Sequence, residues 1–142
     1  MQEALRLAEK AETKNEVPVG AIIVLDGEII AEGFNQPRVQ HDPTAHAEII
    51  ALRNAGQKIN NYRLLNSTLY VTLEPCIMCA GAIIHARIKH LIYGAPDKKA
   101  GAVISQQKAF DYPFLNHHVA YQGGLLAQDS ARLLQQFFQS RR

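Results

Sequence analysis

The sequence predicts an α/β protein, a three-layer α/β/α sandwich on a mixed sheet of about five strands. Short apolar runs of strand-like composition alternate with longer segments of helical periodicity, which is typical of strands covered by helices. The run over residues 17–25 is apolar at nearly every position, so its strand should be covered on both faces. Repeats, low-complexity tracts and linkers are absent from the sequence, and residues 1–142 are expected to form a single domain.

The chain is expected to open with a helix and a hairpin. Alanine and leucine recur at helical spacing, which predicts an amphipathic helix over residues 3–14. Asp26-Gly27 is a strong two-residue hairpin signal between the apolar runs 17–25 and 28–34. We therefore predict that these two runs are antiparallel strands.

The middle of the chain alternates helix and strand. Residues 44–55 are apolar nearly all round, which predicts a buried helix. Residues 67–73 read as a strand that leads directly into a helix over 76–87, and a further strand follows over 88–94. Because a helix connects these two strands, they should be parallel through a right-handed crossover. Small residues on the helix over 76–87 allow close packing, and we predict that this helix contributes to a homodimer surface.

The last third of the chain gives weaker patterns. Residues 98–110 could contain a short helix, and Tyr112-Pro113 would end it. A short strand is expected over residues 119–121. Leucines and phenylalanine from Leu126 to Phe137 then mark a C-terminal helix.

Composition and charge are those of an ordinary globular protein. Apolar residues make up 47% of the chain and charged residues 20%. No stretch is long and apolar enough to be a transmembrane span, and the first residues begin an amphipathic pattern instead of a leader, so we expect a cytoplasmic protein. The net charge of +2 is too small to indicate a nucleic-acid partner by itself.

Three side chains have the spacing of a catalytic zinc site. Cys76 and Cys79, the two cysteines of the chain, are three positions apart and would lie on one side of a helix start. His46 is the third candidate ligand, and three protein ligands leave the fourth zinc position for water. Because the first motif follows Asp42-Pro43-Thr44 and the second follows Pro75, both are expected in a first helical turn. The sequence therefore predicts one Zn²⁺ per subunit.

Glu48, two residues after His46, is the candidate catalytic group. Two thiolates and a neutral imidazole cancel the charge of Zn²⁺, so the bound water should be less acidic than in a three-histidine site. We hypothesise that Glu48 takes a proton as zinc-bound hydroxide forms and delivers it to the substrate ring and the departing amine. The positive ends of two helices would not favour a neutral carboxyl at Glu48.

Two non-hydrolytic alternatives stay open at this stage. The Cys76–Cys79 pair could be a redox motif, which also follows a strand and opens a helix. It could also belong to a structural zinc site with a second histidine as fourth ligand. The candidates for that ligand are His41, His85, His90, His117 and His118.

The motifs His46-Ala47-Glu48 and Pro75-Cys76-Ile77-Met78-Cys79 resemble those of the zinc-dependent cytidine and nucleobase deaminase superfamily. Within it, the stretches 17–21, 41–48 and 68–76 resemble the bacterial tRNA-specific adenosine deaminases, and the likeness extends over nearly the whole chain. The resemblance implies a cytidine deaminase-like fold and a homodimer that converts adenosine to inosine at the wobble position of a tRNA anticodon. Deamination of a free base or nucleotide, such as guanine or cytosine, stays the alternative within the superfamily.

The resemblance also implies roles for individual residues. His46, Cys76 and Cys79 match the zinc ligands, and Glu48 matches the proton shuttle. Three further residues match positions that bind the tRNA anticodon loop: Asn35 for the flipped nucleoside, the backbone of Ala47 for its base, and Asp97 for the loop backbone.

Overall fold

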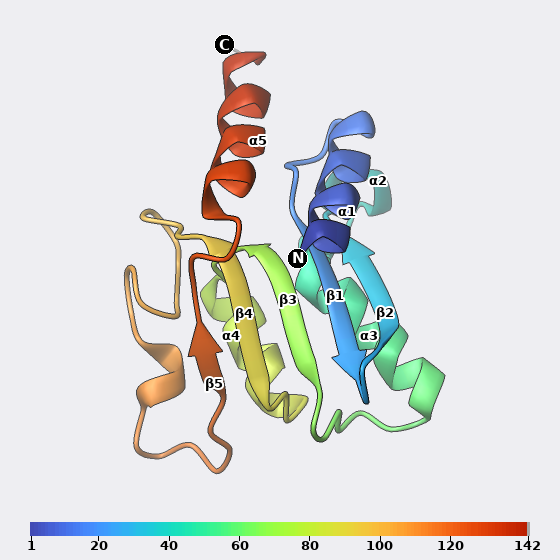
Figure 1. Ribbon diagram of the computed structural model, residues 1–142, viewed down its shortest axis with the longest axis vertical. Coiled ribbons are helices and arrows are strands. Elements are labelled where there is room, and N and C mark those ends of the chain that lie inside the picture. The colour runs from blue at the N-terminus through green and yellow to red at the C-terminus, as the bar shows by residue number, and fades with distance from the viewer. Residues whose placement is uncertain (142) are drawn as a thin grey trace.

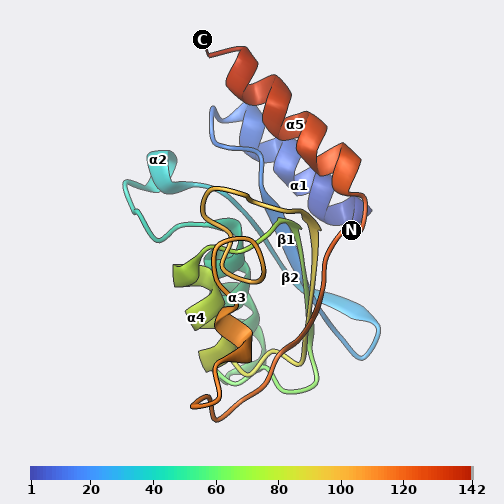
Figure 2. The ribbon, with the colours of Figure 1, turned by 90° about the vertical axis from the view of Figure 1, so that its left-hand side faces the viewer.

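A computed structural model describes residues 1–141 and has the predicted three-layer architecture. One sheet of five strands, in the order β2-β1-β3-β4-β5, forms the middle layer (Figure 1). Helices α1 and α5 cover one face of the sheet, and α3 and α4 cover the other (Figure 2). The strands are β1 (Gly20–Leu25), β2 (Glu28–Phe34), β3 (Thr68–Leu73), β4 (His90–Ala95) and β5 (Ala120–Gln122). The main helices are α1 (Gln2–Thr13), α3 (Ala47–Ile59), α4 (Ile77–His85) and α5 (Ala127–Gln139).

The sheet is mixed, as predicted. β1 pairs antiparallel with both β2 and β3, whereas β3 with β4 and β4 with β5 are parallel. Asp26 and Gly27 both have positive φ, 52° and 78°, which matches the two-residue hairpin expected there. The crossover through α4 puts the carboxyl ends of β3 and β4 at the same edge of the sheet. The residues that follow these two strands are therefore brought to one edge.

Helices α3 and α4 begin later than the sequence predicts. The helix predicted over 44–55 is α3, Ala47–Ile59, because Thr44 is held in a turn by the Asp42 carboxylate, which accepts its backbone N–H at 2.9 Å. His46 then has extended backbone angles, φ −74° and ψ 156°, and is the N-cap. The helix predicted over 76–87 is α4, Ile77–His85, with Cys76 as its N-cap.

A short helix, α2 (Pro37–Gln40), was not predicted. The Glu16 carboxylate accepts the backbone N–H groups of Arg38 at 3.3 Å and Val39 at 2.8 Å. Glu16 is 1% exposed. A four-residue helix has no periodicity to read, and this one is stabilised by a side chain distant in sequence, so local pattern could not reveal it.

The strand predicted over 17–25 begins only at Gly20. Pro18 has no N–H to donate, and the N–H of Val19 bonds the carbonyl of Val17 at 2.8 Å, so these residues form a turn before β1. The remaining strands and α5 agree with the prediction to within a few residues at each end.

The short helix expected within 98–110 is present only as a 3₁₀ turn at the end of that segment, directly before Tyr112. Turns occupy most of this segment, and only a single 3₁₀ turn, η1 (Ala109–Asp111), is helical. The N–H groups of Val103, Ile104 and Ser105 all donate to the carboxylate of Glu74, so they are not available for helical hydrogen bonds.

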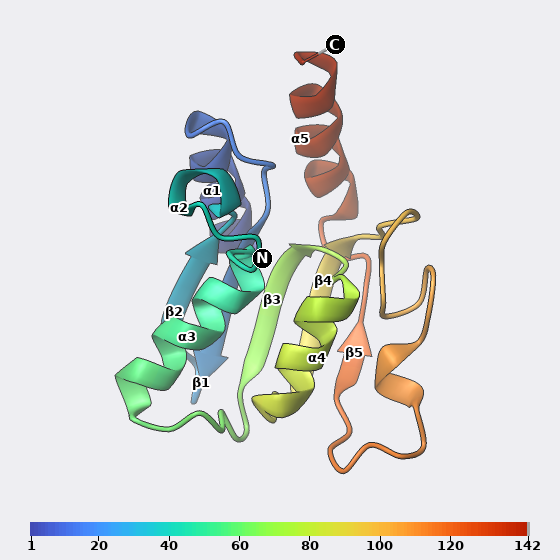
Figure 3. The same ribbon diagram turned by 180° about the vertical axis from the view of Figure 1, so that it is seen from behind.

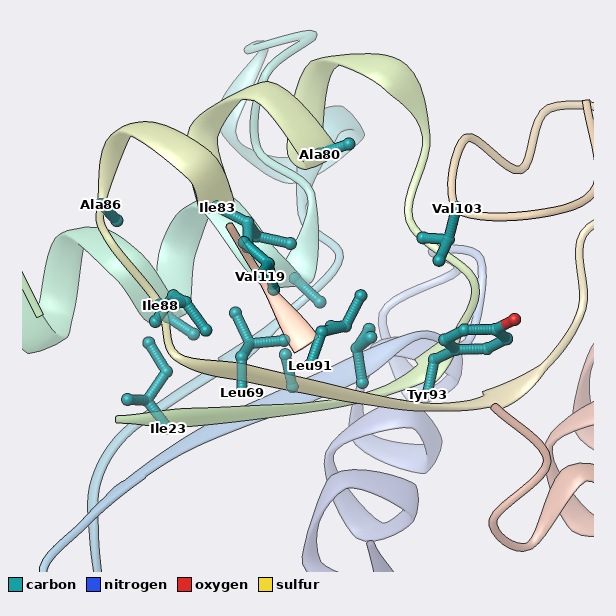
Figure 4. Packing of buried hydrophobic residues seen from close by; sticks show 14 of the residues in the cluster. Ile23, Leu69, Ala80, Ile83, Ala86, Ile88, Leu91, Tyr93, Val103 and Val119 are labelled. Atoms are coloured by element: carbon teal, nitrogen blue, oxygen red, sulfur yellow. The ribbon is translucent and has the colours of Figure 1, made fainter. Parts of the chain in front are cut away.

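The apolar core cluster lies between the sheet and the helices α3 and α4, and Figure 4 shows the packing of part of it. Side chains of the four strands β1 to β4 meet those of α3, of α4 and of the segments that flank α4. The residues labelled in Figure 4 are Ile23, Leu69, Ala80, Ile83, Ala86, Ile88, Leu91, Tyr93, Val103 and Val119. None of the helices within residues 1–141 has the length and apolar character needed to cross a membrane.

Candidate metal centre and active site

The three predicted metal ligands come together at the N-terminal ends of two helices. His46 is the residue before α3, Cys76 is the residue before α4, and Cys79 lies in the first turn of α4. Figure 3 shows both helices beginning at the same end of the sheet. The expectation that both motifs occupy a helix start is confirmed, and the positive ends of both helix dipoles face this site.

The distances between the donor atoms fit a single zinc ion. The Nδ1 atom of His46 lies 3.6 Å from Cys76 Sγ and 3.5 Å from Cys79 Sγ. Zinc bond lengths of about 2.3 Å to sulfur and 2.0 Å to nitrogen, at a tetrahedral angle, require a separation of about 3.5 Å between sulfur and nitrogen. The three donor atoms also lie within 4.8 Å of one another. Both sulfur-to-nitrogen separations therefore fit a shared zinc ion.

The site has three protein ligands and an accessible side. Within residues 1–141, His46, Cys76 and Cys79 are the sole group of three or more potential ligands that could hold a metal ion. The sulfur-bearing residue Cys79 is fully buried, whereas His46 and Cys76 are partly exposed. The Nε2 atom of another candidate, His117, instead lies 2.7 Å from the carbonyl oxygen of Ile88. Three ligands and an open side are typical of a catalytic zinc site, not of a structural one.

The thiols and the imidazole change each other's pKa. Hydrogen bonding with Cys79, and then with His46, lowers the pKa of Cys76 to about 4 against the opposing effect of burial. The neighbouring Cys76 sulfur and burial raise the pKa of Cys79. Hydrogen bonding with Cys76 raises the pKa of His46. Cys76 is therefore the readily formed thiolate of the pair, and a bound cation would favour the thiolate at both cysteines.

Glu48 lies in the first turn of α3 and is 4% exposed. Burial raises the pKa of its carboxyl to about 7, and the nearby His46 only partly offsets this effect. Desolvation thus opposes the field of the helix ends at Glu48, and the expectation that the helix ends together with a bound metal keep this carboxyl ionised stays a prediction. A carboxyl that titrates near neutral pH can both accept and donate a proton.

Asn35 and Ala47 are directly connected. The Oδ1 atom of Asn35 accepts the backbone N–H of Ala47 at 2.8 Å, and both residues are buried. This bond ties the end of β2 to the first turn of α3 and fixes the Asn35 carboxamide beside the metal ligands. A base that bound the Ala47 N–H would have to share this donor with the Asn35 Oδ1 atom.

Asp97 lies just beyond β4, at the edge of the sheet where Cys76 follows β3. Its Oδ1 atom accepts the backbone N–H groups of Lys99 at 3.1 Å and Ala100 at 3.2 Å. Asp97 is partly exposed, and both lysines that follow it are exposed. The structure thus places Asp97 in a tight turn at the edge of the sheet where β3 and β4 end.

Gly33 determines how closely α3 approaches the sheet. A Cβ atom at this position of β2 would lie 2.3 Å from the Ala47 carbonyl oxygen and 2.7 Å from the Ala51 backbone nitrogen. Only glycine lets the helix start come this near, and the helix start carries His46, Ala47 and Glu48. The role of Gly33 was not predicted from the sequence, because a glycine within a strand can mark a bulge, a bend or a close approach of another backbone.

The buried carboxylates of Glu16 and Glu74 were also missed. Glu16 holds α2, which follows Asn35, and Glu74 holds the loop that follows Asp97. In the sequence, each is an acidic residue next to an apolar strand, and this pattern alone does not distinguish a buried carboxylate from a solvent-exposed one.

The fold and this site define a zinc-dependent deaminase. The model of the family described as the cytidine and deoxycytidylate deaminase zinc-binding region matches residues 1–95, which include all three candidate ligands and Glu48. Guanine deaminase from Nitrosomonas europaea shares the fold, with a TM-score of 0.84 and 23% identity over 96% of this chain and 81% of its own.

Proteins that are more similar to this chain than guanine deaminase identify the family within the zinc-dependent deaminases. The tRNA-specific adenosine deaminase of Haemophilus influenzae is 58% identical over the whole of this chain and 83% of its own length. A solved structure from a study of A-to-I editing by tRNA:A34 deaminases has a TM-score of 0.92 and 47% identity, covering 94% of this chain and 97% of its own. The chain belongs to the family of tRNA-specific adenosine deaminases.

Proposed function

We propose that this chain catalyses the hydrolytic deamination of adenosine to inosine at the wobble position of a tRNA anticodon. The observation that carries the proposal is the buried Glu48 carboxyl beside the three-ligand cluster, in a chain that is 58% identical over its whole length to a tRNA-specific adenosine deaminase. A redox role for the cysteine pair would leave both His46 and Glu48 unexplained, since neither is needed for disulfide exchange.

His46, Cys76 and Cys79 would hold the zinc ion, and zinc when bound supplies a Lewis acid that makes water a better nucleophile. Glu48 takes one proton from the attacking water and gives it to the ring nitrogen of adenine. It then moves the second proton of that water from the new hydroxyl group to the amine, which leaves as ammonia when the carbonyl forms. Burial raises the pKa of the Glu48 carboxyl, which favours a group that both accepts and donates a proton near neutral pH.

Substrate contacts are proposed for Asn35, Ala47 and Asp97. Because Asn35 Oδ1 already accepts the Ala47 N–H, its Nδ2 hydrogens are the donors that would bind the flipped nucleoside. A carboxylate repels phosphate groups, so Asp97 would accept a hydrogen bond from a ribose hydroxyl or a base amino group of the anticodon loop. An anticodon loop suits the site because an unpaired base costs least to extrude.

We also propose that residues 1–142 form one domain, that the protein is a homodimer and that it acts in the cytoplasm on tRNA. Helix α4 presents Ile77, which is 54% exposed, and Gly81, where an added Cβ would meet no atom within 4 Å. Between α3 and α4 lies an apolar groove of about 820 Å³, lined in part by Leu52 and Ala82. These features support a surface for a second copy. A monomer at micromolar concentration in sedimentation velocity would contradict the dimer.

Comparison of substrates tests the proposed reaction. The zinc-loaded protein is incubated with a tRNA anticodon stem-loop that carries adenosine at the wobble position, and in parallel with free guanine and free cytosine. We expect inosine in the RNA and no product from either free base. Product from guanine or cytosine with unchanged RNA would replace this proposal with a free-base deaminase.

A stem-loop with adenosine moved one position along the loop is the matched control for recognition. It offers the same chemistry to the metal centre but not the same register to Asn35 and Asp97. Equal inosine formation at both positions would leave the deaminase chemistry intact and contradict the wobble-position specificity.

A further inference from the structure

We propose that Glu74 is a positioning residue for the RNA substrate: its carboxylate holds the loop over residues 96–106, and with it Asp97, in place beside the metal centre. Glu74 precedes Pro75-Cys76 and is 2% exposed. This inference rests on the proposed function, because it gives the held loop a role in RNA binding.

The Glu74 carboxylate accepts hydrogen bonds from both ends of the loop. Oε2 accepts the backbone N–H groups of Val103 at 3.1 Å, Ile104 at 2.9 Å and Ser105 at 3.0 Å. Oε1 accepts the Ser105 hydroxyl and the backbone N–H of Asp97 at 3.1 Å. Successive backbone N–H groups that converge in this way form an anion-binding concavity, and here the anion is a side chain of the protein itself.

The loop is shaped around this carboxylate. A Cβ atom on Gly101 would lie 2.3 Å from Glu74 Cδ, so only glycine lets the backbone pass so near. The Ala102 N–H also donates to the Pro75 carbonyl oxygen at 2.8 Å, and the side chain of Val103 is fully buried. The loop is therefore fixed to the two residues that directly precede the metal ligand Cys76.

The exposed part of the same loop faces outward with polar side chains. Lys98 and Lys99 are exposed, and the Asp97 carboxylate closes the turn that leads to them. Because β3 and β4 are parallel neighbours, this turn and Cys76 extend from the same edge of the sheet. Glu74 thus links the position of Asp97 to that of the metal centre without contributing a ligand.

A loop that is held before substrate arrives needs less ordering on binding, which favours affinity more than the chemical step. Replacement of Glu74 should therefore raise KM for the RNA and change kcat little. Loss of a purely structural contact would instead lower the amount of folded, zinc-loaded protein and leave the KM of the remaining enzyme unchanged.

Glu74→Gln is the first test, because it keeps the side-chain volume but turns an NH₂ group toward backbone donors. With the anticodon stem-loop as substrate, we expect KM to rise about tenfold and kcat to change less than about threefold, with zinc content unchanged. Glu28→Gln is the matched control, since it makes the same chemical change at an exposed position of the β1–β2 hairpin and should leave KM unchanged.

Gly101→Ala tests the same contact from the other side if Glu74→Gln does not fold. Its added methyl group displaces the loop from the carboxylate, and we expect the same rise in KM. Amide hydrogen exchange should show faster exchange at Val103, Ile104 and Ser105 in either variant. An unchanged KM in a folded variant whose loop amides exchange faster would overturn the inference.

A double-mutant cycle with Asp97→Asn tests the link to the substrate contact. Asparagine retains the oxygen that closes the turn, but it removes the charge and replaces the other carboxylate oxygen by an NH₂ group, which cannot accept a hydrogen bond from the RNA. If Glu74 acts by placing Asp97, the effect of Asp97→Asn on KM should largely disappear in the Glu74→Gln background. Independent, multiplicative effects would overturn the inference, whereas absence of RNA deamination by the unmodified protein would instead overturn the proposed function.

Discussion

Substitution of Gly33 by alanine tests how the fold positions the metal centre. The new Cβ atom would lie 2.3 Å from the Ala47 carbonyl oxygen, whereas ordinary contacts begin at 3.4 Å. The start of α3 would have to move by about 1 Å, and overpacking of this kind costs about 1–3 kcal/mol of folding stability. Because Ala47 follows His46 directly, the movement would also displace the histidine ligand.

Activity should fall more than stability suggests. A misplacement of about 1 Å in an active site can reduce the rate by about 100-fold. We therefore expect Gly33→Ala to remain folded at 25 °C, to bind zinc more weakly than the unmodified protein, and to lose about 100-fold in kcat/KM for the stem-loop RNA. The assays are urea unfolding, zinc titration against a chelator, and inosine formation at saturating zinc.

Gly81→Ala is the control for zinc binding within one subunit, because its Cβ would meet no atom of the same chain within 4 Å and α4 is helical there. This change should leave zinc affinity unchanged and raise stability by up to about 1 kcal/mol, the helix propensity difference between the two residues. Normal zinc affinity and turnover in Gly33→Ala would refute the argument that the close approach of β2 and α3 sets the geometry of the ligands.

Four other substitutions give distinct expected results. Asn35→Ala should lower stability by about 1–3 kcal/mol in urea unfolding because the buried Ala47 N–H loses its acceptor. Asn35→Asp should recover much of that stability but not the activity on RNA; recovered activity would remove Asn35 from the substrate contacts. Ser130→Ala should stabilise the fold by about 1 kcal/mol with unchanged deamination, since the Ser130 hydroxyl is buried without a hydrogen-bond partner among residues 1–141, and a loss of stability would contradict this. Although burial by itself raises the pKa of Glu74, hydrogen bonds from Ile104, Ser105 and Asp97 outweigh it and lower the pKa below its ordinary value of 4.5. The stability that the ionised Glu74 contributes is therefore fully present above pH 4.5 and is lost as pH falls through the lowered pKa. The free energies of unfolding in urea of Glu74→Gln and of the unmodified protein should therefore differ most at neutral pH and converge in acid. A difference that is independent of pH would contradict the ionised state of Glu74.

The sequence was sufficient to predict the layers of the fold and to identify candidate metal ligands that the structure brings together, because both depend largely on short motifs. The Asp26-Gly27 turn, the apolar run of β1 and the spacing of Cys76 and Cys79 each have a short-range physical cause. The positions of helix ends were less predictable. The start of α3 depends on the Asp42 side chain and on the extended backbone of His46, and neither follows from hydrophobic periodicity.

What sequence analysis missed depends on contacts between residues far apart in the chain. The Glu74 carboxylate accepts hydrogen bonds from the backbone N–H groups of residues 103–105. Because these groups are not free for helical hydrogen bonds, turns occupy most of the segment 98–110, where a helix was predicted. The raised pKa of Glu48 depends on burial, which the sequence of a first helical turn does not reveal. Both residues are acidic side chains whose role is set by tertiary packing.

The account rests on Glu48 carrying protons beside a zinc ion held by three protein ligands. Measurement of zinc content and single-turnover inosine formation in Glu48→Gln tests this claim most directly. We predict about one zinc per subunit, as in the unmodified protein, and a rate lower by about 10²- to 10⁴-fold. Near-normal inosine formation by the zinc-loaded Glu48→Gln protein would contradict the central claim.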